Sequence, residues 1–388
     1  MGFPRTSDRQ NLSKKIRMTL TLIFSAFTFC YIYILQPDLL SYLQHLFSHG
    51  LTTYNRLSGA LIILFITLAI HSSVAAATKL QGHVYALTYI PSAVFLLVLT
   101  DLIAEYSLSK LIAYLVVLLL ALFYYIKSTS TKYRRDNNVN SGAAFISNVV
   151  ILSIIMSLIG LQGNGNDVLH YELKIERLLN EKKYDEAINV GRKSLVTSEK
   201  LTYLRAFALS NKNELGEKIF EYPVAYTDNP LLPCRKDSTG MIFHPDNIYR
   251  YLGAFPEHTF TPYQFLHLLS SQTELLNTHP QIKDYLLITL LFQKKLDMFA
   301  AEIKRFYDFS DSSLVLPKHY REAMVLYSRM RTKPVVSIKD NITETNYDEF
   351  NALRESHKNV IVGTNAVRRQ YGDTYWWYFY YVKPTGKP

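Results

Sequence analysis

Five long apolar stretches follow one another between Met18 and Leu161. Each approaches the ~20 residues with which an α-helix crosses about 30 Å of hydrocarbon. Backbone groups in lipid must be satisfied within the segment, so each stretch is expected to be helical. The predicted spans are Met18–Leu35, Leu57–Ala77, Tyr85–Ile103, Leu111–Ile126 and Ala143–Leu161. Pro91 is expected to kink the third span.

The first stretch follows a basic start, which is also typical of a signal peptide. No A-x-A-like cleavage site follows it, and the chain continues Gln36-Pro37-Asp38. An uncleaved span is therefore expected. Between the first two spans, Leu39 to Phe47 places apolar residues at helical spacing, which indicates either an amphipathic helix on the membrane surface or an extension of a neighbouring span.

Beyond residue 163 the pattern changes to short amphipathic helices with polar breaks. Two helix pairs are expected over Leu169–Phe220, followed by a proline-rich insertion at 223–262 with a short helix at Asn247–Leu252. That insertion is either a functional loop or a wrap over the helices. Later helices are expected at Pro262–Asn277, Pro280–Phe292, Asp297–Phe306, Pro317–Met330, Tyr347–Ser356 and Ala366–Val382. The sequence thus predicts an all-α protein with a helical solenoid after the membrane bundle.

Charge is distributed unevenly along the 388 residues, although mean hydropathy is near zero at +0.01. Up to Gly163 there are 12 Lys/Arg and 5 Asp/Glu, and after it 30 and 27. Most of the net charge of +10 therefore lies around the spans, and the second part has no basic run for binding nucleic acid. We predict three parts: a basic tail at 1–17, a transmembrane domain at 18–162 and a water-soluble domain at 163–388.

Lys and Arg in the short flanks of the spans predict the orientation in the membrane. One side has ten of them and the other has only Arg56 and Lys110. The ten are Arg5, Arg9, Lys14, Lys15, Arg17, Lys79, Lys127, Lys132, Arg134 and Arg135. The N-terminus is therefore expected in the cytoplasm, and five spans place the C-terminal domain on the outer side of an inner membrane.

No known catalytic or metal-binding motif is present. The sequence has no phosphate loop, H-E-x-x-H, G-x-S-x-G or EF-hand pattern. The two cysteines, Cys30 and Cys234, exclude a cysteine-based zinc site, and no cofactor is expected. Two polar residues remain as weak candidates. Asp38 follows Pro37 near the membrane surface, where it either caps a helix or acts as a base or metal ligand. His71, inside the second span, either pairs with a neighbouring helix or lies on a proton or substrate path.

The segment Leu179-Asn180-Glu181-Lys182-Lys183-Tyr184-Asp185-Glu186-Ala187-Ile188 resembles the turn and second helix of a tetratricopeptide repeat. Tyr184 and Ala187 occupy the family's aromatic and small positions, but the Trp and Gly of its first helix are absent. At the C-terminus, Tyr375-Trp376-Trp377-Tyr378-Phe379-Tyr380-Tyr381 indicates a buried terminal helix, rings at a membrane interface, or a stacking surface for sugar or peptide. Tyr184, Trp376, Trp377 and Tyr380 are therefore the candidate interaction residues.

The whole arrangement resembles uncharacterised multipass membrane proteins of Bacteroides-type bacteria, which end in a tetratricopeptide-like region and a Tyr/Trp-rich stretch. Three segments carry the resemblance: Asn229-Pro230-Leu231-Leu232-Pro233, Leu316-Pro317-Lys318-His319-Tyr320-Arg321-Glu322-Ala323 and Tyr371-Gly372-Asp373-Thr374-Tyr375-Trp376-Trp377. The resemblance implies a periplasmic location for residues 163–388. It implies no activity.

These observations favour a membrane-anchored helical-repeat scaffold that contacts the lipid bilayer and binds another envelope protein. The alternative is an envelope glycan enzyme, or an accessory subunit of one. Multipass transferases of lipid-linked sugars resemble this layout and have an acid in the first outer loop, where this chain has Asp38, but such enzymes usually have a second acid there and more spans. A transporter would depend on His71 alone.

Overall fold

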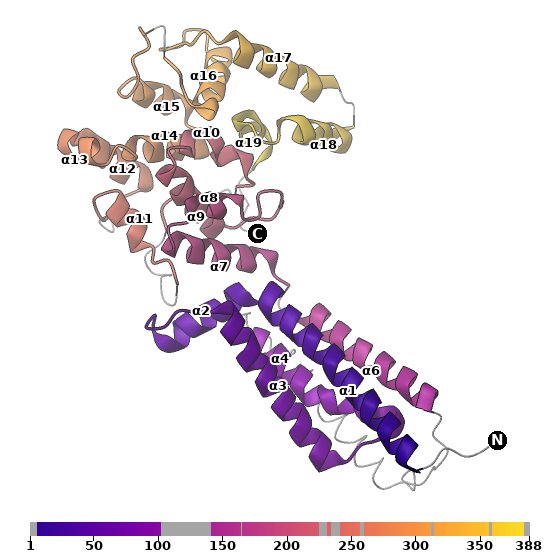
Figure 1. Cartoon of the computed structure of the whole chain (residues 1–388). Helices are drawn as coiled ribbons and strands as arrows, with labels where there is room; N and C mark the ends of the chain where they lie inside the picture. The colour runs from indigo at the N-terminus through magenta and orange to yellow at the C-terminus, as the bar shows by residue number, and fades with distance from the viewer. Residues whose placement is uncertain are drawn as a thin grey trace. The chain divides into compact units, whose positions relative to one another are not determined.

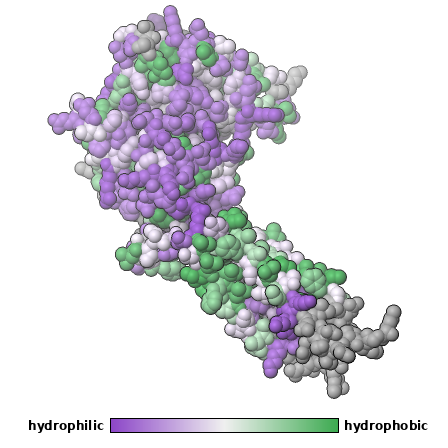
Figure 2. All heavy atoms as spheres, viewed as in Figure 1, coloured by the Kyte–Doolittle hydropathy of each residue, from purple (hydrophilic) through white to green (hydrophobic). Residues whose placement is uncertain are grey.

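The computed structural model describes residues 6–101, 141–163, 165–224, 231–233, 241–256, 260–311, 314–356 and 359–383. Within these ranges the chain is helical and has no strand, which confirms the predicted all-α class. Two compact units divide it, unit 1 over Met1–Asn166 and unit 2 over Asp167–Pro388 (Figure 1). Figure 2 shows hydrophobic residues spread over the helices of unit 1 and hydrophilic residues over unit 2.

Unit 1 contains four helical segments long and apolar enough to cross a membrane: Lys14–Leu35, Arg56–Thr78, Gly82–Asp101 and Gly142–Gln162. They correspond to four of the predicted spans and indicate a membrane protein. The other, Leu111–Ile126, lies outside the described residues. The elements of unit 1 are α1 (Thr6–Cys30), η1 (Tyr31–Leu35), α2 (Pro37–Ser48), α3 (Arg56–Thr78), η2 (Gly82–Tyr89), α4 (Ile90–Asp101) and α6 (Ser141–Gln162).

The third span consists of two kinds of helix. It begins as the 3-10 helix η2 and continues as α4, and Pro91, the residue expected to kink it, occupies the first turn of α4. A 3-10 helix of eight residues is long for its class, because its hydrogen bonds have poorer geometry than those of an α-helix. Side chains from other helices therefore have to hold η2 in place.

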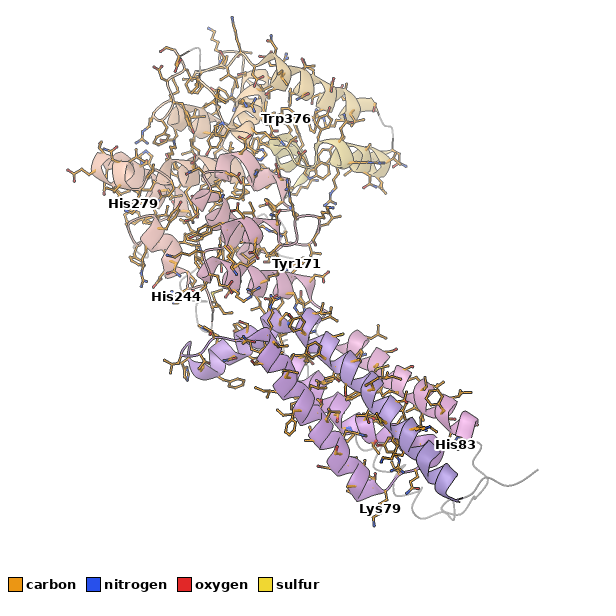
Figure 3. All side chains as sticks on the ribbon, in the orientation of Figure 1. Lys79, His83, Tyr171, His244, His279 and Trp376 are labelled. Atoms are coloured by element: carbon orange, nitrogen blue, oxygen red, sulfur yellow. The ribbon has the colours of Figure 1, made fainter. Side chains whose placement is uncertain are left out.

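The chain enters and leaves unit 1 at opposite ends. At one end the Arg17 guanidinium of α1 lies 5.0 Å from the centroid of the Tyr85 ring of η2, and His83 contacts Ser147 near the start of α6. At the other end the Tyr31 hydroxyl donates to Thr100 at 3.3 Å. A Cβ on Gly163 would lie 2.2 Å from that same hydroxyl oxygen, so the end of α6 approaches Tyr31 as only glycine allows. Figure 3 labels His83 and Lys79 at the first of these ends.

Unit 2 is a set of short helices around one continuous hydrophobic core. In its first part, α7, α8 and α9 pack on one another, and α10 packs on α14 and α16. The elements are α7 (Asp167–Asn180), α8 (Tyr184–Asn189), α9 (Glu199–Asn211), α10 (Leu215–Lys218), η4 (Ile219–Glu221), α11 (Asp246–Tyr251), α12 (Pro262–Ser271), α13 (Thr273–Thr278), α14 (Ile282–Phe292), α15 (Leu296–Ile303), α16 (Lys318–Met330), α17 (Asn341–Ser356), α18 (Val360–Tyr371) and α19 (Tyr375–Tyr381).

Two predicted helices are each divided in the structure. The run expected over Pro262–Asn277 breaks at Gln272, between α12 and α13. The run expected over Ala366–Val382 breaks between α18 and α19, where the Thr374 hydroxyl accepts from the Trp377 N–H at 3.2 Å and starts a new helix. A side-chain cap competes locally with continuation of the helix, which apolar spacing alone does not reveal.

The described part of the proline-rich insertion packs onto the helices. Leu231, Leu232 and Phe243 are buried in the core of unit 2. The Glu176 carboxylate of α7 accepts from the Ile242 N–H at 2.8 Å, and the Tyr249 hydroxyl donates to the Pro233 carbonyl oxygen at 2.6 Å. Of the two interpretations of the insertion, these contacts favour a wrap over the helices.

Candidate functional site

Asp38 lies in the first turn of α2, where a negative charge is favourable to the helix dipole. Its Oδ1 atom lies 3.7 Å from Nη2 of Arg56, the first residue of α3. Two residues before it, Gln36 donates to the Tyr31 hydroxyl at 3.4 Å, and Tyr31 donates to Thr100. The end of unit 1 that holds Asp38 therefore also holds Asp101, a second carboxylate that the sequence does not place beside it.

His71 is 3 % exposed and both of its ring nitrogens are occupied. The Thr88 hydroxyl donates to the Tyr85 carbonyl oxygen at 2.7 Å, so its oxygen accepts from the His71 Nδ1–H at 3.2 Å. Nε2 then accepts from the Tyr85 hydroxyl at 3.3 Å. This tautomer follows from the hydrogen-bond network. The ring also stacks on Tyr89 with centroids 3.8 Å apart. His71 is thus held by η2 as a neutral packing residue.

Tyr184 begins α8 and is half-buried against α9. Its ring meets that of Phe207 edge to face, with centroids 6.4 Å apart. Ala187, one turn later, is fully buried. The two positions that resemble a tetratricopeptide repeat therefore take part in packing α8 against its neighbours.

The three aromatic candidates on α19 differ in their surroundings. Trp376 is 2 % exposed, and its Nε1–H donates to the Glu322 carbonyl oxygen at 2.8 Å (Figure 3). Trp377 is half-buried and stacks on Tyr381 with centroids 4.4 Å apart. Tyr380 is half-buried, shares a 3.1 Å hydrogen bond with Tyr347 and lies under the Arg354 guanidinium. Trp376 therefore belongs to the core, and Trp377 and Tyr380 lie at its edge.

Burial is the main reason why the pKa of the Tyr347 hydroxyl rises to about 12, and its hydrogen bond to Tyr380 adds to the shift. The phenol stays protonated at physiological pH, so the pair serves as an uncharged link between α17 and α19.

The sequence did not indicate a buried network around Glu322 on α16. Its carboxylate accepts from the Tyr375 N–H at 2.7 Å and lies 2.9 Å from His319 Nδ1. His319 Nε2 in turn accepts from the Phe220 N–H at 3.3 Å. The i, i+3 spacing of His319 and Glu322 is the signal that could have found it. The network joins three segments of unit 2.

The surface of unit 2 carries an unusual apolar feature at the start of α18. Val360, Ile361 and Val362 are 79 %, 74 % and 52 % exposed, and the Asn359 side chain caps the helix beneath them. We call these three residues the α18 tip. Exposure of consecutive aliphatic residues to water is unfavourable. Where a folded protein keeps such a patch, the patch commonly marks an interaction site.

Among the described residues, no group of three or more His, Cys, Asp or Glu side chains is placed to hold a metal ion. The arrangement offers packing networks in both units and, in unit 2, the exposed apolar α18 tip. It places Asp38 and Asp101 at the same end of unit 1 and leaves His71 and Trp376 in the interior.

The profile of a protein family of unknown function, DUF6057, matches residues 261–382, about a third of the chain. The match begins at Thr261, whose hydroxyl and Gln264 form the capping box of α12, and ends one residue after α19. It contains the Glu322 network and the α18 tip. No curated protein and no solved structure matches the chain.

Proposed function

We propose that the chain is a membrane-anchored helical scaffold of the cell envelope whose unit 2 binds another protein. The observation that carries this proposal is the α18 tip, Val360, Ile361 and Val362, whose side chains extend from a folded helical surface into solvent. A protein partner that covers them would remove apolar area from water, and each Å² so buried would contribute about 25 cal/mol to the free energy of binding. Such patches mark interaction sites more often than isolated exposed apolar residues do.

We further propose that the helix pairs at the start of unit 2 are degenerate tetratricopeptide repeats. The packing of α7, α8 and α9 on one another supports this, as does the fully buried small residue Ala187 at their contact. Stacked helical hairpins form extended surfaces suited to peptides and partner helices. Repeats of this kind would explain how a chain without catalytic motifs contributes to an assembly.

The proposed orientation places the N-terminus in the cytoplasm and unit 2 in the periplasm of a cell with an inner membrane. Two observations support it. Lys14, Lys15, Arg17 and Lys79 flank the spans on the side predicted to be cytoplasmic. Within unit 1, α1 begins near η2 whereas α6 ends near Tyr31, so the two lie at opposite ends.

Crosslinking and co-purification in mild detergent test the scaffold proposal. A partner should co-purify in constant ratio with the wild-type chain and be lost from the V360D/I361D double variant, because charges cannot enter an apolar contact unpaired. The matched control is Ile342→Asp, at the other end of α17, where an equally exposed aliphatic residue should tolerate the change. A wild-type chain that always emerges alone and monomeric would rule the proposal out.

One observation favours an enzyme as the second candidate. The Tyr31–Thr100 hydrogen bond places the end of α4, and with it Asp101, at the end of unit 1 that holds Asp38, so a second acid is available there although it comes from another segment than the first outer loop. On this hypothesis Asp38→Asn abolishes an envelope-glycan phenotype without lowering the amount of protein. A variant with unchanged glycans would eliminate it.

A further inference from the structure

Arg205 is a buried arginine that has no anionic partner within the described part of the chain. It lies on α9 and is 1 % exposed. Its Nη2 atom donates to the carbonyl oxygens of Val190 at 3.3 Å and Gly191 at 3.5 Å, and the guanidinium carbon lies 5.0 Å from the centroid of the Tyr222 ring. Nε and Nη1 are also buried, and neither has an acceptor among the described residues.

Three described acids of this part of unit 2 pair with other cations. Glu172 and Glu176 of α7 pair with Lys200, and Glu221 pairs with Arg192 at 2.8 Å. No ion pair involves Arg205 in the described ranges of the chain. A guanidinium remains protonated at all physiological pH values, and a buried charge is costly unless an opposite charge and full hydrogen bonding compensate it. The two long hydrogen bonds to carbonyl oxygens and the contact with the Tyr222 ring supply neither an opposite charge nor full hydrogen bonding.

We propose that Arg205 is the anchor of a binding site for an oxyanion, either a carboxylate or a phosphate. Such a group accepts from several guanidinium N–H donors at once, which is the pairing in which arginine is strongest. It would satisfy Nε and Nη1 and neutralise the charge. The inference goes beyond the scaffold proposal and does not depend on it.

The cover over Arg205 is a turn and one aromatic ring. Gly191 has φ +61°, and a Cβ there would lie 2.8 Å from the Tyr171 ring, so that ring lies directly on the backbone whose carbonyl accepts from Arg205. Figure 3 labels Tyr171 on α7. The connector that follows, residues 191–197, exposes Leu195 and Val196 to solvent. Because Arg205 is 1 % exposed, an anion would have to displace this turn or the ring to reach the guanidinium.

Thermal unfolding of the full chain in detergent tests the site, with inorganic phosphate or acetate replacing chloride at constant ionic strength. We expect a saturable rise on the order of 5 °C for the wild type. A larger response to phosphate than to acetate would assign a phosphate ligand, and the reverse would assign a carboxylate. Absence of a saturable rise with either anion would overturn the proposal.

Two variants separate this site from general charge effects. Arg205→Gln should abolish the response, whereas Arg331→Gln, which removes an exposed arginine already paired with Asp297, should keep it. Equal loss in both variants would contradict the proposal. If Arg205→Gln does not fold, Arg205→Lys keeps the charge but loses the planar donor set, and should need about tenfold more of the anion. An unchanged midpoint in Arg205→Lys would count against the site. Because these measurements use the isolated chain, their failure is distinct from a missing protein partner.

Discussion

The carboxylate of Glu322 shows how single residues hold unit 2 together. It accepts from the Tyr375 backbone and lies against His319, while the Glu322 carbonyl oxygen accepts from the Trp376 indole. Because His319 Nε2 accepts from the Phe220 N–H, its proton must lie on Nδ1, where it is donated to Glu322. The C-terminal aromatic helix is thus attached to α16 by buried, fully paired polar groups.

Glu322→Ala should lower the free energy of unfolding by roughly 2–4 kcal/mol, because it leaves two buried N–H donors without an acceptor. Denaturant titration followed by Trp fluorescence measures this directly, since Trp376 lies at the network. Glu355→Ala is the control. The Glu355 side chain is exposed and its ion pair with Arg354 is long, at 3.9 Å, so the free energy of unfolding should change by no more than about 0.5 kcal/mol. Equal effects in the two variants would contradict the role assigned to Glu322.

Asp340 makes a pH-dependent contribution at the start of α17. Burial works against ionisation, but hydrogen bonds from the Thr343 side chain and backbone, together with Arg321, outweigh it and hold the pKa of Asp340 below its ordinary value. The lowered pKa means that the stabilisation is present above about pH 4 and is lost as the pH falls through the folded-state pKa.

Asp340→Ala should therefore cost about 1 kcal/mol at pH 7, as expected for loss of a helix cap. The difference from wild type should shrink as the pH falls below about 4 and through the lowered pKa of the folded wild-type carboxyl. Unfolding curves at several pH values provide the measurement. A cost that stayed constant down to acid pH would show that the carboxylate charge is not involved.

At the scale of elements, the 3-10 helix η2 depends on one side chain of α6. Asn148 Oδ1 accepts from the Ala86 N–H at 2.7 Å, and its Nδ2 donates to the Gly82 carbonyl oxygen at 2.6 Å. The His71 ring packs against η2 from α3 through Tyr85, Thr88 and Tyr89. In a membrane segment such contacts replace water as partners for the backbone.

Asn148→Ala should destabilise unit 1 by about 2 kcal/mol, because it leaves backbone groups of η2 unpaired within the bundle. The loss should appear as a lower unfolding temperature in detergent. Ser147→Ala, at the adjacent position, is the matched control and should change little, because it removes a 3.3 Å contact to His83 and a hydrogen bond to the backbone of its own helix but leaves the η2 backbone paired. If both variants unfolded at the wild-type temperature, η2 would be stable without Asn148.

For the whole molecule, the sequence predicted the elements better than their contacts. Apolar length predicted four helices that the structure contains, because lipid permits few other backbone conformations. Thr261-Pro262 predicted the start of α12 correctly, because its cap is local. The partners of His71 and Glu322 come from other elements, so spacing along the chain could not supply them. Arg205 offered a signal, since it interrupts the apolar stripe of Leu201, Leu204 and Ala208 on α9.

A periplasmic unit 2 requires a chain that enters and leaves the membrane on opposite sides. Alkaline phosphatase and green fluorescent protein, each fused after Lys387, measure this directly, because the phosphatase needs an oxidising compartment to form its disulfides. We predict an active phosphatase and a dark fluorescent protein at Lys387, with the reverse for fusions after Lys79. An inactive phosphatase together with a bright fluorescent protein at Lys387 would place unit 2 inside the cell and contradict the proposed periplasmic scaffold.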